Sequence, residues 1–139
     1  MRRLGALAIA LALGGCSTVV AEAESEALCP PGQEHLRTAQ LFFGRNVSAK
    51  PGVSQADFQS FVDQEITPRF PDGLTVMEGG GKWRGSENQL IREASKVVLI
   101  VLPKKRDTSQ RIEAVRAAYK TRFNEESVLL VTQAACVSF

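Results

Sequence analysis

The stretch Lys96-Val97-Val98-Leu99-Ile100-Val101-Leu102-Pro103 decides the fold of this 139-residue chain. Its six consecutive branched aliphatic residues are too few for a buried helix and they end at a proline, so they predict a β-strand. Because no polar residue alternates with the apolar ones, both faces of this strand need to be covered. We therefore expect the strand in the interior of a sheet.

A strand and a helix are predicted before this stretch. Residues Leu36–Gly44 have strand character, with two phenylalanines at their centre. Ser54 and Asp57 form a capping-box arrangement, followed by apolar residues at helical spacing. The helix should end near Thr67, because a proline follows and disfavours the helical conformation of the residue before it.

The central part of the chain predicts a long hairpin. Leu74–Met77 is the second strand, and it runs into Gly79-Gly80-Gly81, where we expect a bend or a bulge. The segment Gln89–Ser95 is open to two interpretations: a short helix capped by Ser86, or an early start of the third strand. We prefer the early start, which gives a long bent hairpin.

A second helix and a last strand complete the predicted order. The helix begins at Asp107 or Thr108 and ends near Asn124, and the strand begins at Val128–Val131. The order β-α-β-β-α-β is that of a ferredoxin-like α+β fold, with strand order 4-1-3-2 and both helices on one face of an antiparallel sheet. This topology places Val97–Leu102 between strands one and two, in the interior that its apolar residues require.

The N-terminus has the pattern of an export signal. A positively charged start, an apolar segment and small residues before Cys16 predict a signal peptide over residues 1–15, too short to span a membrane. Leu13-Gly14-Gly15-Cys16 resembles the lipobox of bacterial lipoproteins, which implies acylation of Cys16 and stable anchoring. The alternative is an ordinary signal peptide cut elsewhere. Ser17, at the position where aspartate marks inner-membrane retention, implies the periplasmic leaflet of the outer membrane.

Residues 16–28 then form an acidic tether, and residues 29–139 form a single α+β domain. Two cysteines, Cys29 and Cys136, remain in the domain, and an oxidising compartment favours a disulfide over two free thiols. In the predicted topology the end of strand four lies beside the start of strand one. The two cysteines occupy those places, so the pairing agrees with the fold.

The charge balance excludes some classes of partner. The chain has 17 Lys+Arg and 15 Asp+Glu, and removal of Arg2 and Arg3 with the signal peptide leaves 15 of each. A mature chain near neutrality gives no indication of binding to nucleic acid or to an anionic membrane. The run Lys104-Lys105-Arg106 is most simply a solvated loop.

An open sheet face is a consequence of this fold. Two helices cover one face, yet Val97–Leu102 is apolar on both, and Phe42 and Phe43 point in opposite directions. A large exposed apolar patch usually marks an interface. We expect a homodimer through the open face, by analogy with dimeric α/β-barrel proteins.

The chain resembles a family of small bacterial secreted proteins and lipoproteins catalogued as domain of unknown function 3574 (DUF3574). The resemblance covers about Thr38 to Phe139. It rests on these stretches: Leu41-Phe42-Phe43-Gly44-Arg45, Ile66-Thr67-Pro68-Arg69-Phe70-Pro71-Asp72-Gly73-Leu74-Thr75-Val76, Gly81-Lys82-Trp83-Arg84, Glu93-Ala94-Ser95-Lys96-Val97 and Ala135-Cys136-Val137-Ser138-Phe139. The resemblance implies no particular activity.

The candidate ligand-binding residues are the polar and aromatic ones in these stretches: Arg45, Trp83, Arg84, Glu93 and Lys96. Trp83 would stack on a ligand or close the hairpin. Glu93 and Lys96 would form an ion pair, or Glu93 would act as a general base.

Other catalytic and cofactor chemistry finds little support in the residues. His35 is the sole histidine and has no motif around it, so neither a Ser-His-Asp site nor a zinc site is predicted. Gly79-Gly80-Gly81 matches no phosphate-binding or dinucleotide motif, and we predict no metal and no cofactor. Two function classes remain: a non-catalytic module that binds a ligand or partner, and a small cofactor-independent enzyme of the dimeric α/β-barrel type.

Overall fold

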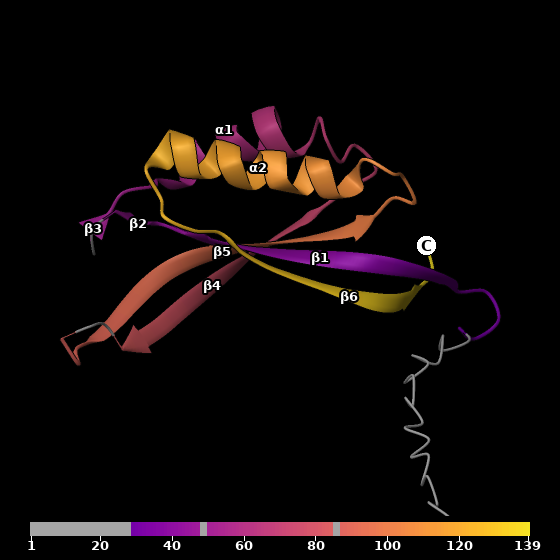
Figure 1. The fold of residues 1–139 in the computed structure, drawn as a ribbon, viewed down its shortest axis with the longest axis horizontal. Helices are drawn as coiled ribbons and strands as arrows, with labels where there is room; N and C mark the ends of the chain where they lie inside the picture. The colour runs from indigo at the N-terminus through magenta and orange to yellow at the C-terminus, as the bar shows by residue number, and fades with distance from the viewer. Residues whose placement is uncertain (1–28, 48–49, 85–86) are drawn as a thin grey trace, which may run out of the picture.

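A computed structural model describes residues 29–47, 50–84 and 87–139, which form an antiparallel sheet with two helices packed on one face (Figure 1). The elements in chain order are β1 (Glu34–Gly44), β2 (Asn46–Val47), β3 (Lys50–Pro51), α1 (Gln55–Phe61), its π-helical continuation η1 (Val62–Ile66), β4 (Thr75–Arg84), β5 (Leu90–Leu102), α2 (Thr108–Phe123) and β6 (Leu129–Val137). The four-stranded sheet has the order β4-β5-β1-β6. The predicted α+β fold and strand order are confirmed. The predicted signal peptide, Cys16 and the tether lie outside the described residues.

Strand β5 occupies the interior of the sheet, as its apolar sequence predicts. It pairs with β1 on one side and β4 on the other, both antiparallel. Val98, Ile100 and Leu102 are buried beneath the helices, and Val97, Leu99 and Val101 alternate with them on the uncovered face. The apolar run therefore contributes to both faces of the sheet, of which the helices cover only one.

The predicted capping box begins α1. The hydroxyl of Ser54 accepts a hydrogen bond from the backbone N–H of Asp57 at 3.1 Å. The helix then widens into η1 and ends at Thr67, whose N–H donates to the carbonyl of Val62 at 2.9 Å. Its two buried phenylalanines, Phe58 and Phe61, lie on the core side.

An aromatic cluster joins both helices to β1. The ring of Phe43 lies 5.5 Å from that of Phe58, 5.9 Å from that of Phe61 and 4.7 Å from that of Tyr119 on α2. All four residues are at most 1% exposed. Edge-to-face packing of this kind adds about 0.5–1.5 kcal/mol per pair to the burial itself. The cluster fixes both helices over one end of β1.

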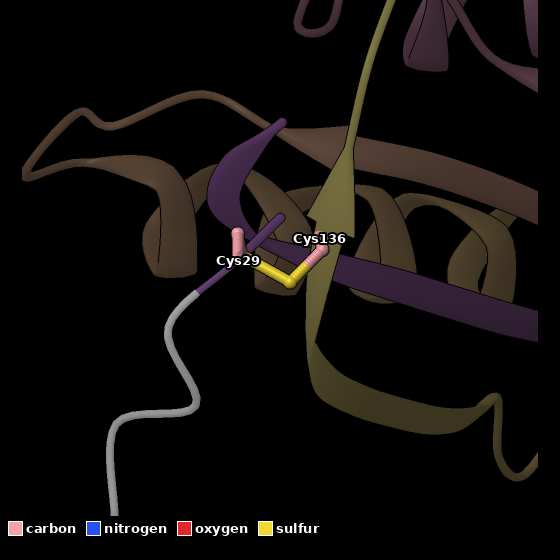
Figure 2. The surroundings of a disulfide bond; sticks show 2 residues. All are labelled: Cys29 and Cys136. Carbon is pink, nitrogen blue, oxygen red and sulfur yellow. A yellow bond between two sulfur atoms is a disulfide. The ribbon is translucent and has the colours of Figure 1, made fainter. Parts of the chain in front are cut away.

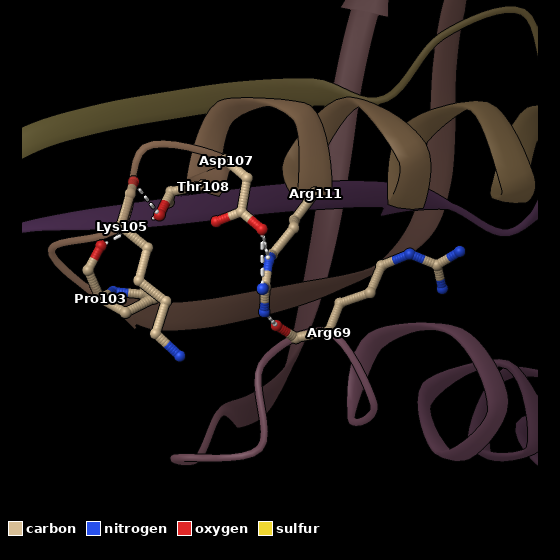
Figure 3. Close-up of polar contacts among 6 residues, drawn as sticks. All are labelled: Arg69, Pro103, Lys105, Asp107, Thr108 and Arg111. Atoms are coloured by element: carbon tan, nitrogen blue, oxygen red, sulfur yellow. Dashed lines mark hydrogen bonds and ion pairs between the residues drawn. The ribbon is translucent and has the colours of Figure 1, made fainter.

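Asp107 occupies the N-cap position of α2, but its side chain makes no capping hydrogen bond. Its carboxylate instead accepts from Nε of Arg111 at 2.8 Å, and Arg111 Nη1 donates to the carbonyl of Arg69 at 3.0 Å (Figure 3). The hydroxyl of Thr108 is shared between the carbonyls of Pro103 at 3.0 Å and Lys105 at 2.8 Å. The helix ends at Asn124, which adopts the left-handed conformation with φ 54°.

The β4–β5 hairpin excludes the bulge, one of the two alternatives expected at Gly79-Gly80-Gly81, and confirms the early start of the third strand. The pairing register is constant from Thr75 to Arg84, so the glycine run forms no bulge. Gly79 is required for a different reason: a Cβ there would lie 2.7 Å from the hydroxyl of Ser95 on β5. β5 begins at Leu90, which confirms the early start of the third strand. Ser86, the cap of the alternative helix, lies outside the described residues.

The two cysteines meet at the edge of the sheet. Figure 2 shows Cys29 joined to Cys136 near the end of β6, with Cα atoms 5.4 Å apart. His35 on β1 is paired with Cys136 in the register of the two strands. The start and the end of the domain are therefore held side by side, as the sequence predicts.

Candidate functional site

The candidate residues from the sequence do not converge on one site. Arg45 and Glu93 lie near each other at the end of β1, where the N–H of Arg45 donates to the carbonyl of Ala94 at 3.0 Å. Arg84 lies at the far end of the β4–β5 hairpin, and its Nη1 donates to Asn88 Oδ1 at 2.8 Å. The side chain of Trp83 lies outside what the structure describes.

Lys96 lies on the opposite face of β5 from Glu93, beneath the helices. The predicted Glu93–Lys96 ion pair is wrong, because residues three apart on a strand point to opposite faces. Lys96 forms an ion pair with Glu78, its neighbour on β4, and its ammonium lies 6.0 Å from the centre of the Phe58 ring. Only 2% of Lys96 is exposed. Its position indicates a structural role.

Arg45 and Glu93 belong to a group that we call the Gly44 cluster: Gly44, Arg45, Glu93, Tyr119 and Glu125. The carboxylate of Glu93 fills the space that a side chain at Gly44 would need. The hydroxyl of Tyr119 donates to the carbonyl of Gly44 at 2.6 Å, and Nε of Arg45 donates to the carbonyl of Val53 at 2.8 Å. These contacts bring β1, β5 and α2 together.

Two groups of the cluster have perturbed acidity. Burial raises the pKa of the Tyr119 hydroxyl, and the charges of Glu125 and Glu93 raise it further, against the opposing effect of Arg45. Burial also raises the pKa of Glu125, with added repulsion from Glu93 and Glu126. One carboxylate oxygen of Glu125 is buried without a hydrogen-bond partner. The Gly44 cluster therefore combines a neutral phenol with a carboxyl group that resists ionisation.

No pattern in the sequence selects Tyr119 and Glu125 as site residues. Tyr119 counts as one more apolar position of α2, and Glu125 follows the end of that helix. Their proximity to Glu93 can be seen only in the structure, because β5 and the end of α2 are distant in the sequence and come together on folding.

A hollow lies at the opposite end of the sheet, between the start of β1, the end of β5 and the start of α2. Its volume is about 340 Å³. We call it the basic hollow, and it is lined by His35, Leu36, Arg37, Leu102, Pro103, Lys104, Lys105, Thr108 and Ser109. Sequence reasoning missed this site, since Lys104 and Lys105 read as a solvated loop and His35 as an isolated histidine.

Metal and membrane features are absent from the described part of the chain. Within residues 29–47, 50–84 and 87–139, no three His, Cys, Asp or Glu side chains gather as metal ligands. Over the same ranges, no helix combines the length and the apolar character needed to cross a membrane.

The fold is similar to that of solved proteins. A phage SAM lyase in complex with S-methyl-5'-thioadenosine has a TM-score of 0.57 and 19% identity, with 82% of this chain and 95% of that chain covered. A phage SAM lyase in the apo state has a TM-score of 0.56 and 21% identity, with 76% and 90% covered. CutA from Synechococcus elongatus reaches a TM-score of 0.48 at 8% identity, with 73% and 78% covered. At 19% and 21% identity, the similarity to the two phage SAM lyase structures shows the fold alone.

The sequence itself gives the family. No curated protein matches the chain. The family model described as "Protein of unknown function (DUF3574)" matches residues 38–139, which include β4, β5, β6, both helices and β1 from Thr38 onward. The chain belongs to the DUF3574 family.

Proposed function

We propose that this protein is a lipid-anchored cell-envelope module that binds a second copy of itself through the open face of its sheet. The observation that carries the proposal is the apolar character of the sheet face opposite the helices, a face that neither helix covers (Figure 1). Alternation along the paired strands assigns to this face Leu36, Phe42, Met77, Val97, Leu99, Val101, Leu129 and Val131. All four strands contribute to it.

The charge pattern favours a second copy as the occupant. Between Leu36 and Phe42 on β1, and at the positions paired with them, the open face carries no charged residue. Two such faces meet without burying like charges, which would otherwise oppose self-association.

The size of the face is compatible with a stable dimer. Four strands about 4.8 Å apart and about 30 Å long give a flat footprint of roughly 600 Å². Side-chain relief raises the accessible area above that footprint, toward the roughly 800 Å² per partner of a standard interface. Met77, Leu129 and Val131, which are 40%, 58% and 40% exposed, would contribute much of the area buried.

Association can be tested on the exported chain carrying Cys16→Ser, which lacks the acylated residue. Light scattering during size exclusion at micromolar concentration should give twice the chain mass. Leu99→Asp, at the centre of the open face, should give a monomer. The matched control is Leu90→Asp, because Leu90 is 56% exposed on the helix side of the hairpin, and it should stay dimeric.

A monomeric wild-type chain would overturn the proposal, as would equal behaviour of the two aspartate variants. If the wild type forms a larger oligomer that Leu99→Asp dissociates, the open face is the interface but the two-copy stoichiometry is wrong. Circular dichroism of each variant checks that the fold is intact.

The location of the protein is part of the proposal. The lipobox-like residues before Cys16 support acylation there and anchoring in the periplasmic leaflet of the outer membrane. The disulfide between Cys29 and Cys136 agrees with an oxidising compartment. Mass spectrometry should find a mature chain beginning at acylated Cys16, and Cys16→Ser should release it from the membrane fraction. An unacylated mature chain would exclude the anchor.

A small cofactor-independent enzyme is the second candidate, favoured by the Gly44 cluster. A carboxyl group and a phenol with raised pKa values at one place are typical of acid–base sites. The fold's likeness to phage SAM lyase suggests S-methyl-5'-thioadenosine as a first probe. Calorimetric titration should show that S-methyl-5'-thioadenosine binds to the wild type and binds more weakly to Tyr119→Phe. The absence of any heat of binding at millimolar concentration would exclude ligands of this class.

A further inference from the structure

We propose that the basic hollow binds the phosphate group of a small glycerophosphate-like ligand. Its lining supplies the cations of Arg37, Lys104 and Lys105 together with the imidazole of His35, and none of the residues that line it is acidic. Arginine and lysine side chains are the groups that most often bind phosphate in proteins. The near-neutral charge of the whole chain conceals this local excess of positive charge.

The carboxylates nearest to the hollow are already paired. Glu34 lies 3.6 Å from the ammonium of Lys104, and both side chains are more than two-thirds exposed, so this pair is weak. Asp107 is held by Arg111 at 2.7 Å, and the hydrogen bond from Arg111 lowers the pKa of Asp107. The guanidinium of Arg37 donates to the uncharged hydroxyl of Thr132 at 3.0 Å, and the charge of Lys105 contributes to the lowered pKa of Asp107. An incoming anion therefore meets Arg37 without a carboxylate bound to it.

The start of α2 adds to the preference for an anion. Thr108 and Ser109 of its first turn line the hollow, and this turn contains no acidic residue. Figure 3 shows Pro103, Lys105 and Thr108 at the turn that leads into the helix, with the Asp107 carboxylate directed to Arg111. The Asp107 side chain therefore makes no hydrogen bond to the backbone N–H groups at the start of α2, and its charge there is paired with Arg111.

The volume of the hollow and its apolar walls limit the kinds of ligand that it could bind. A volume of about 340 Å³ is near the lower end of small-molecule sites, so the hollow exceeds what a bare phosphate would fill. Leu102 and Pro103 supply apolar walls, whereas the side chain of Leu36 lies on the open face of the sheet. A phosphate carried on a short glycerol-like group fits this combination of charge and apolar surface.

The position of the hollow favours a lipid headgroup as the source of that phosphate, and this step rests on the proposed anchor at Cys16. The disulfide holds Cys29 beside Cys136, which is paired with His35 of the hollow. Residues 17–28, twelve in number, separate Cys29 from the anchor at Cys16. Twelve residues reach at most roughly 40 Å even when fully extended, which bounds the distance of the hollow from the headgroups.

The test uses the full exported chain with Cys16→Ser, and two probes. The first is sn-glycerol 3-phosphate, titrated calorimetrically. The second is a set of vesicles of phosphatidylglycerol or phosphatidylcholine, to which binding is measured by sedimentation. Arg37→Gln and Lys105→Gln should each weaken binding about tenfold, the loss of one charge-assisted contact. The charge-matched control Lys120→Gln, in the last turn of α2, should bind like the wild type.

Binding of glycerol 3-phosphate that depends on Arg37 and Lys105 supports the site and identifies a soluble ligand. Equivalent dependence with phosphatidylglycerol vesicles alone supports it and identifies the headgroup. No binding to either probe, or equal loss in the Lys120→Gln control, overturns it. Binding only after Glu22, Glu24 and Glu26 are replaced by glutamine also overturns it, because the acidic tether would then be the occupant. Light scattering of the same samples measures the oligomeric state, so that failure of ligand binding can be distinguished from failure of dimerisation through the open face.

Discussion

The ion pair between Lys96 and Glu78 is asymmetric, so its two partners should contribute differently to stability. Lys96 is 2% exposed, whereas the Glu78 side chain is 72% exposed. At an effective dielectric constant of about 20, two charges about 4 Å apart attract each other by roughly 4 kcal/mol. Removing an ammonium group from water costs several kcal/mol. The attraction therefore roughly offsets the cost of burying Lys96.

Substitutions on the two sides of this pair should have unequal effects. Glu78→Gln leaves the Lys96 ammonium buried without its counter-charge and should lower the free energy of unfolding by about 2–3 kcal/mol. Lys96→Met keeps the packing of the aliphatic stem near Phe58 and removes the cost of burying the charge. It should change the free energy of unfolding by less than about 1 kcal/mol, or increase it.

Urea denaturation followed by far-ultraviolet circular dichroism at pH 7 measures these values. The wild type, both single variants and the double variant complete a cycle, and its coupling energy should be about 2 kcal/mol. A loss above about 3 kcal/mol for Lys96→Met, together with a Glu78→Gln variant as stable as the wild type, would refute the reasoning. Such a result would mean that Lys96 stabilises the fold through contacts other than Glu78.

Three further predictions concern covalent, steric and electrostatic features. Cys29→Ser with Cys136→Ser should lower the free energy of unfolding, by at most about 4.8 kcal/mol from chain entropy for a sequence separation of 107, and reduced wild type should match this variant in calorimetry. Gly79→Ala should cost about 1–2 kcal/mol because of its close approach to β5, whereas Gly80→Ala, with its nearest atom at 3.9 Å, should be neutral or stabilising in the same denaturation assay. Glu125→Gln should stabilise the protein at pH 7. The raised native pKa means that the native state holds this proton more tightly than the unfolded state does. The wild type therefore loses stability as pH rises from the ordinary value of 4.5 through the native value, and the gain from Glu125→Gln should vanish below pH 4 in thermal scans.

Each of these predictions has an outcome that contradicts it. A doubly substituted serine variant as stable as the wild type would contradict the loop-closure estimate. Equal costs at the two glycines would show that the approach to β5 is not the constraint. If Glu125→Gln still stabilises the protein at low pH, the gain in stability comes from packing and not from removal of the charge.

Local patterns in the sequence were sufficient to predict the elements and their order. Ser54 with Asp57 determined where α1 begins, and Asn124 marked the end of α2. The run Val97–Leu102 required an interior position, which β5 occupies. Each of these signals acts within a few residues, or through a requirement for burial that only one topology meets.

The parts that the sequence did not predict depend on contacts between distant segments. Lys96 is buried because Glu78 lies beside it on β4, and the spacing to Glu93 along the chain pointed to the wrong partner. A side chain at Gly79 would approach Ser95 on β5 too closely, whereas the sequence predicted a bend or a bulge there. The basic hollow combines the start of β1 with the turn before α2, segments more than sixty residues apart whose charges look unrelated along the chain.

The oxidation of Met77 tests the open face most directly. Met77 lies on that face, 40% exposed, and it is the sole methionine apart from Met1. With the exported Cys16→Ser chain in hydrogen peroxide, mass spectrometry gives the rate of sulfoxide formation as a function of protein concentration. The account predicts that oxidation slows several-fold as the chain associates, and that Leu99→Asp oxidises at one fast rate throughout. A wild-type rate that does not change with concentration, up to the highest reached, would contradict the central claim.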